Sequence, residues 1–104
     1  MTNNEQVALW LGYKFDATRP DDLQWESPTG EMNGDAPMFD HYYNLWPAIY
    51  REIERRGLCK RFLDHLVGYR ELHTEVDLAW FILVATPAER LAAMEKVIEE
   101  DNHG

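Results

Sequence analysis

The segment Thr86-Pro87-Ala88-Glu89 is the strongest local structural signal in this chain. A threonine N-cap accepts a hydrogen bond from a free amide of the first helical turn, and a glutamate three residues later bonds back to the cap. Proline suits the first helical position because that amide has no partner to lose. We therefore predict a helix from Ala88 to about Glu100. Its apolar face is expected to consist of Leu91, Met94, Val97 and Ile98.

The longest apolar run, Leu78 to Ala85, directly precedes this signal. Its eight residues are far fewer than the roughly 20 that a membrane-spanning helix needs. The run is rich in β-forming residues, so the composition predicts a buried strand over 78–84, with a buried helix as the alternative.

Helical spacing of apolar residues predicts three further helices. The first covers Glu5 to Leu11, with Asn3 or Asn4 as its N-cap and Gly12 as the glycine that ends it. Its apolar positions lie on one face, so we expect this helix to depend on packing against the rest of the chain.

The second helix is expected to begin near Asn44, unless Asp40 caps an earlier turn, and to end at Gly57. Pro47 is tolerated there because it lies in the first turn. A third helix is predicted over 58–67 and should pack against the second as a helical hairpin.

Residues 16–37 are polar and rich in proline and glycine, as is typical of turns. Within them, Leu23 to Glu26 alternates apolar and polar residues and predicts a short strand. The sequence from Ser27 to Gly30 predicts a tight turn, and a second strand is expected at Glu31-Met32. We therefore predict a single α+β domain over 1–104, with about four helices and a sheet of two or three strands.

The chain is acidic: its 104 residues include 19 acids and 10 bases, for a net charge of −9. This charge argues against binding to nucleic acids or to anionic membrane surfaces, and it favours partners with basic surfaces. Residues 48–72 carry a net charge of +2, whereas both flanking segments are acidic. The single cysteine, Cys59, and the polar first residues predict a cytoplasmic protein.

The residues that usually carry catalysis or metal binding show no supporting pattern. A zinc site needs ligands at short spacing, and neither the histidines nor Cys59 have such partners. We predict no catalytic residue, no metal site and no cofactor. The hypothesis of a small enzyme or ligand-binding protein would rest on Cys59, His65 or His73. The four histidines are His41, His65, His73 and His103.

Two groups of surface-type residues remain as a candidate partner-binding site. The first is an acidic stretch in which Arg19 is the one base, and the second is an aromatic-rich segment from Phe39 to Tyr50. The acidic stretch suits a basic partner, which it would attract by imitating nucleic-acid phosphates, and a solvated loop is the alternative. The aromatic segment holds more rings than one helix face can bury, and exposed tyrosines are typical of interfaces. The predicted partner-binding residues are Asp16, Asp21, Asp22, Glu26, Glu31, Asp35, Asp40, Tyr42 and Tyr43.

Several motifs in this order resemble the small phage proteins grouped as the phage ABA sandwich domain. They are Leu11-Gly12-Tyr13, Trp25-Glu26-Ser27-Pro28-Thr29-Gly30, Pro37-Met38-Phe39-Asp40, and the segment from Ala85 to Ala93. The resemblance implies a phage or prophage origin, and hence a place in the host cytoplasm, together with a layered α–β–α arrangement. The family has no established catalytic residues, so none is transferred to this chain.

The sequence therefore predicts a non-enzymatic phage accessory protein that binds a host protein. In its sharper form this is an inhibitor of a host defence factor, of the anti-CRISPR or another anti-defence type, whose nucleic-acid-binding surface is basic. The alternative is a structural or regulatory protein that self-associates, as a homodimer, through its aromatic residues.

Overall fold

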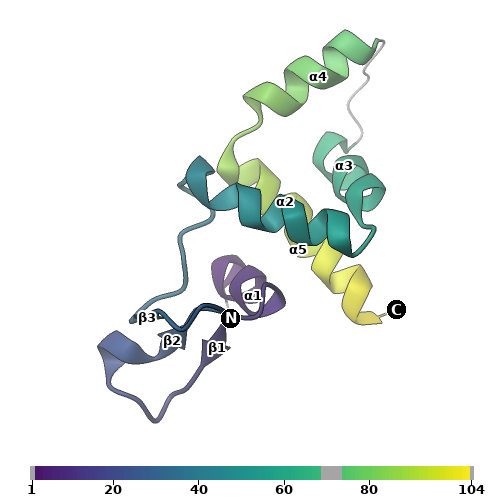
Figure 1. Cartoon of the computed structure of the whole chain (residues 1–104). Coiled ribbons are helices and arrows are strands. Elements are labelled where there is room, and N and C mark those ends of the chain that lie inside the picture. The colour runs from purple at the N-terminus through teal and green to yellow at the C-terminus, as the bar shows by residue number, and fades with distance from the viewer. Residues whose placement is uncertain (1, 69–73, 104) are drawn as a thin grey trace.

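The computed structural model describes residues 2–68 and 74–103, which form five α-helices, two short 3-10 helices and a three-stranded antiparallel sheet (Figure 1). This confirms the predicted α+β class. The elements in chain order are α1 (Asn3–Trp10), β1 (Lys14–Phe15), η1 (Asp21–Leu23), β2 (Trp25–Glu26), β3 (Met32–Asn33), η2 (Tyr43–Leu45), α2 (Trp46–Arg55), α3 (Cys59–Val67), α4 (Glu75–Val84) and α5 (Pro87–His103).

Helix α5 lies at the centre of the helical body, because both α1 and α3 pack against it. Met94 and Val97 of α5 are fully buried, and they share one apolar core with Val7 of α1 and Ile49 of α2. The molecule is elongated, with extents of 51 × 29 × 22 Å. Figure 1 shows the small sheet at one end and α4 extending from the other.

The start of α5 follows the predicted capping box. The Thr86 hydroxyl accepts from the Glu89 amide at 3.1 Å, and the Glu89 carboxylate accepts from the Thr86 amide at 3.2 Å. The helix is slightly longer than predicted, from Pro87 to His103. Its predicted apolar face is confirmed, since Leu91, Met94, Val97 and Ile98 are all buried.

Helix α1 has a different cap from the two predicted asparagines. Thr2 is the N-cap, and its hydroxyl accepts from the Glu5 amide at 3.2 Å. Asn3 and Asn4 instead reach across the fold, where Asn4 donates to the Asp40 carboxylate at 2.9 Å. The prediction of a closing glycine is confirmed, because Gly12 has a φ of +100°.

The predicted hairpin is confirmed, and one strand was missed. Trp25 pairs with Asn33 and Glu26 with Met32, and the turn between them is closed by the Gly30 amide, which donates to the Ser27 carbonyl at 3.0 Å. The additional strand β1 pairs with the opposite edge of β2. Two residues per strand leave no periodicity for sequence analysis to detect.

Helix α2 begins later than predicted. The 3-10 helix η2 occupies Tyr43–Leu45, so the N-cap is Leu45, without a side-chain hydrogen bond, and neither Asn44 nor Asp40 caps it. Pro47 lies in the first turn as expected. The predicted α3 is confirmed as Cys59–Val67.

The predicted buried strand over 78–84 is wrong. This segment lies in α4, where the Thr74 hydroxyl caps the helix by accepting from the Asp77 amide at 3.1 Å. Phe81 is its buried residue, whereas Trp80 is 65% and Leu83 69% exposed. β-Forming residues become a strand only where a neighbouring strand receives them, and the sheet lies at the opposite end of the molecule (Figure 1). None of the described helices is long and apolar enough to span a membrane.

Candidate functional site

Six of the nine predicted site residues lie in one region, residues 14–35, which we call the acidic hairpin lobe. It contains the three strands and η1, and it holds six carboxylates against Lys14 and Arg19. Gly34 brings the end of β3 against η1, since a methyl group there would lie 2.8 Å from the Asp21 carbonyl oxygen. This close approach places the exposed Asp35 near the exposed Asp21 and Asp22.

Arg19 compensates part of the charge of this lobe. Its guanidinium lies 3.5 Å from the Asp16 carboxylate and 3.9 Å from the Glu26 carboxylate, and it also contacts the Met32 sulfur at 3.6 Å.

Hydrogen bonds from the Thr18 hydroxyl and amide hold the pKa of Asp16 below its usual value. These contacts leave four of the six lobe carboxylates, Asp21, Asp22, Glu31 and Asp35, without a hydrogen bond or ion pair to a side chain among the described residues.

Glu31 completes the acidic set. It lies close enough to Tyr13 for its charge to act on the phenol. Burial, with a smaller contribution from Glu31, raises the pKa of the Tyr13 hydroxyl. The phenol therefore stays neutral at physiological pH and adds no charge to the lobe.

Asp40, Tyr42 and Tyr43 do not belong to this lobe. The Asp40 carboxylate accepts from Asn4 at 2.9 Å and helps attach α1 to the segment before η2. Tyr42 and Tyr43 are 53% and 52% exposed, and the Tyr43 hydroxyl donates to the Ala85 carbonyl at 2.9 Å. The predicted site is thus divided among the acidic hairpin lobe, the contact of Asp40 with α1, and the exposed Tyr42 and Tyr43 at the start of η2.

Helix α4 contributes a surface that the sequence prediction missed. Val76, Trp80, Leu83 and Val84 are each at least half exposed, and they recur at helical spacing on one side of α4. We call this set the α4 stripe. The segment Thr74-Glu75-Val76-Asp77 could have revealed the helix, because a threonine followed three residues later by an acid marks a helix start.

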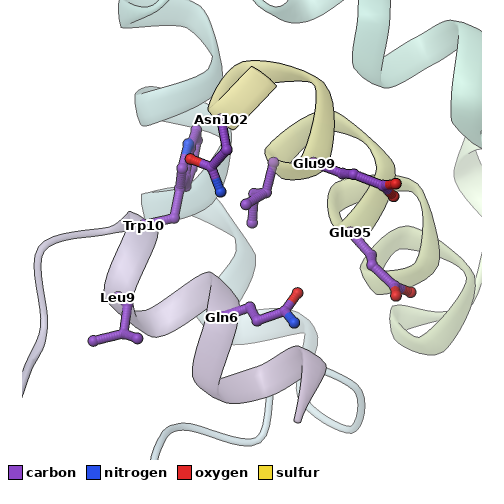
Figure 2. Close-up of a pocket in the computed structure, with 7 residues that line it drawn as sticks. Gln6, Leu9, Trp10, Glu95, Glu99 and Asn102 are labelled. Carbon is purple, nitrogen blue, oxygen red and sulfur yellow. The ribbon is translucent and has the colours of Figure 1, made fainter. Parts of the chain in front are cut away.

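A groove of about 560 Å³ lies between α1 and the C-terminal half of α5, beside the contact of the two helices (Figure 2). Its walls carry the carboxylates of Glu95 and Glu99 and the amide of Gln6, as Figure 2 shows. The indole nitrogen of Trp10, at the edge of the groove, is buried and has no hydrogen-bond partner among the described residues. Neither carboxylate was part of the predicted site, and both extend the acidic character of the surface beyond the lobe.

The structure describes two of the three residues on which an enzymatic hypothesis would rest, Cys59 and His65. Cys59 is exposed beside an apolar groove of about 340 Å³ between α2 and α3, and the described residues that line this groove include no histidine. His65 pairs with the Glu100 carboxylate instead. His73 lies outside the described residues. Within residues 2–68 and 74–103, no group of three histidine, cysteine or acidic side chains is arranged to hold a metal ion.

Arg56 connects the C-terminal ends of three helices. Its guanidinium donates to the Trp10 carbonyl at 3.0 Å, to Glu52 at 2.8 Å and to Asp101 at 3.2 Å. It also lies 4.4 Å from the centre of a Trp10 ring. A cation at this point opposes the partial negative charge that helix C-termini carry.

Because of the Glu52 carboxylate, we expect part of the free energy of unfolding to be lost at acid pH. Hydrogen bonds from Arg55, and secondly from Arg56, lower the pKa of Glu52 from 4.5 to about 2. A carboxyl group whose pKa is lower in the folded state stabilises the fold above its unfolded pKa, and this contribution is lost as the pH falls from 4.5 towards 2. Because Glu52 and its arginine partners lie near the surface, we expect the free energy of unfolding to fall by about 0.5–1 kcal/mol.

Urea unfolding of wild type and Glu52→Gln across this pH range measures the effect. The difference in unfolding free energy between the two should shrink as the pH falls. Glu54→Gln is the matched control, since Glu54 is exposed on the same helix, and its pH profile should follow that of wild type. A wild-type profile parallel to that of Glu52→Gln would contradict the assigned pairing.

No family model, curated protein or solved structure matches this chain. The likeness to phage ABA sandwich proteins therefore stays a prediction from the sequence motifs.

Proposed function

We propose that this chain is a non-enzymatic phage or prophage accessory protein that acts by binding a host protein with a basic surface. The observation that carries the proposal is the acidic hairpin lobe, which holds six carboxylates and two cations at one end of an elongated molecule. Such a local concentration of charge raises the association rate with a basic partner and orients it on approach. The phage origin is supported by the sequence motifs alone.

In its sharper form, the proposal is inhibition of a host defence factor that binds nucleic acid. Proteins of that kind neutralise phosphates with lysine and arginine, so their binding surfaces are basic. The free carboxylates of Asp21, Asp22 and Asp35 would face those side chains in place of phosphates. No bond is made or broken in this action.

Capture from a bacterial lysate at low salt, with the chain immobilised, tests the proposal. The lobe variant carries Asp21→Asn, Asp22→Asn and Asp35→Asn, none of which removes an internal side-chain contact of the described residues. The matched variant carries Glu54→Gln, Asp64→Asn and Glu99→Gln, exposed positions outside the lobe, and has the same net charge. We expect wild type and the matched variant to retain the same basic host protein, and the lobe variant to lose it.

Equal retention by both variants would show that net charge, rather than the lobe, attracts the protein. A wild-type column that retains no host protein at low salt would contradict the proposed function itself.

The self-associating alternative has one specific observation in its favour, the α4 stripe, which is apolar and lies on a different surface from the acidic hairpin lobe.

A further inference from the structure

Helix α4 is apolar around almost its whole circumference. Phe81 is buried on the side that faces the body, with Leu78 and Ile82 half-buried, while the α4 stripe covers the opposite side. The two charges of the helix, Glu75 and Asp77, both lie in its first turn. A helix with apolar residues on all sides is typically buried on all sides. Here one side faces solvent, so the stripe has the character of an uncovered interface.

The size of this surface is suited to protein association. Together with Tyr43, which contacts the C-terminal end of α4, the stripe exposes on the order of 600 Å² of largely apolar side chain, as large as the largest patch of a typical monomer. If two copies covered each other, they would bury about 1,200 Å², the lower end of the range for stable interfaces.

We propose that a second copy of this chain covers the α4 stripe, so that the protein forms a two-fold symmetric dimer through α4. The stripe can pack on an identical stripe because it contains no charged residue and is therefore self-complementary, as a two-fold interface requires. The six carboxylates of the acidic hairpin lobe lie at the opposite end of the 51 Å molecule, so they stay apart when two α4 helices meet. This surface is separate from the lobe, and the proposal goes beyond the proposed function.

The charges of α4 also select the orientation of the pair. A parallel arrangement would bring Glu75 and Asp77 of both copies together at one end, which costs free energy through like-charge repulsion. An antiparallel arrangement places them at opposite ends and opposes the two helix dipoles. In that arrangement Trp80, at the middle of α4, lies closest to the two-fold axis.

Sedimentation equilibrium of the full chain over a hundredfold concentration range tests the proposal. We expect a monomer–dimer equilibrium with a dissociation constant on the order of micromolar, given the modest area. Added salt should lower the dissociation constant of the dimer, because each copy carries a net charge of −9 and salt screens the repulsion between the copies. Binding of a basic partner at the lobe should weaken with salt, so the two proposals fail independently.

Leu83→Glu should raise the dissociation constant about tenfold or more, because a carboxylate would be buried against apolar side chains. The matched control is Ala92→Glu, which adds the same charge at an exposed position of α5 and should dimerise as wild type does. Circular dichroism checks that both variants fold, and Trp80→Ser provides a second stripe variant that adds no charge.

A wild-type chain that stays monomeric at the highest concentration overturns the proposal. Dimers that persist in both Leu83→Glu and Trp80→Ser place the interface elsewhere and overturn it too. Co-sedimentation of a monomeric wild-type chain with uncharged phosphatidylcholine vesicles would assign the stripe to a lipid surface instead.

Discussion

Trp46→Ala is expected to remove a large part of the stability of this protein. Trp46 is 1% exposed, and its rings pack against Tyr50 and Phe62 at centroid distances of 5.7 and 6.3 Å. Its indole nitrogen also donates to the Phe39 carbonyl at 2.9 Å. Truncation of a buried tryptophan costs about 3–5 kcal/mol, out of a total near 5–15 kcal/mol for a domain of this kind.

Urea unfolding followed by circular dichroism measures this effect. Trp80→Ala is the matched control, because Trp80 is 65% exposed and its removal should change the unfolding free energy by less than about 0.5 kcal/mol under dilute conditions. Trp46→Phe keeps most of the packing and loses the indole hydrogen bond, so it should fall between the two, at about 1–3 kcal/mol. Equal losses for Trp46→Ala and Trp80→Ala would contradict the assigned core.

Arg90→Ala is expected to have the second-largest effect and to act mainly on the attachment of α4. Arg90 is 9% exposed and donates to the Ala85 carbonyl at 3.2 Å, to the Ile82 carbonyl at 2.7 Å and to the Tyr50 hydroxyl. Its guanidinium also lies 5.5 Å from the centre of the Tyr43 ring. Loss of these charged donors removes the Arg90 hydrogen bond from the Ile82 carbonyl and leaves the Ala85 carbonyl with the Tyr43 hydroxyl alone, so we expect a loss of about 3 kcal/mol.

Hydrogen exchange distinguishes this effect from general destabilisation. In Arg90→Ala, the amides of α4 should lose protection before those of α1 and α5, because Arg90 holds the C-terminal end of α4 to the body. The control is Arg51→Ala, an exposed arginine on α2, which should change the unfolding free energy by less than about 0.5 kcal/mol. A uniform loss of protection over all helices would contradict the role assigned to Arg90.

The parts of the fold that the sequence predicted well are those with a local chemical signal. The capping box at Thr86 and Glu89 spans four consecutive residues, and Gly12 and Gly57 have the positive φ that closes a helix. The turn from Ser27 to Gly30 is equally local. Such signals act within one or two turns, so they do not depend on how distant segments pack.

Helix α4 shows where this reasoning fails. An apolar run without periodicity has the same appearance in a buried strand, a buried helix and an interface helix, because the surroundings decide among them. The cap at Thr74 is local and could have identified the helix. Its exposure could not have been predicted, since that depends on which segments cover it after folding.

The candidate site was predicted in part for the same reason. The carboxylates of Asp21, Asp22 and Asp35 are close in sequence and stay together because the hairpin keeps them in one region. Tyr43 lies at the C-terminal end of α4 because its hydroxyl donates to the carbonyl of Ala85, 42 residues away. No local sequence pattern encodes this contact.

The measurement that tests the central claim most directly is the salt dependence of affinity between this chain and the purified host protein that it captures. If the acidic hairpin lobe is the binding surface, the logarithm of the affinity falls as salt rises, and neutralising Asp21, Asp22 and Asp35 reduces that slope. The variant altered at Glu54, Asp64 and Glu99 should keep the wild-type slope. Equal slopes for the two variants would contradict a binding function located in the lobe.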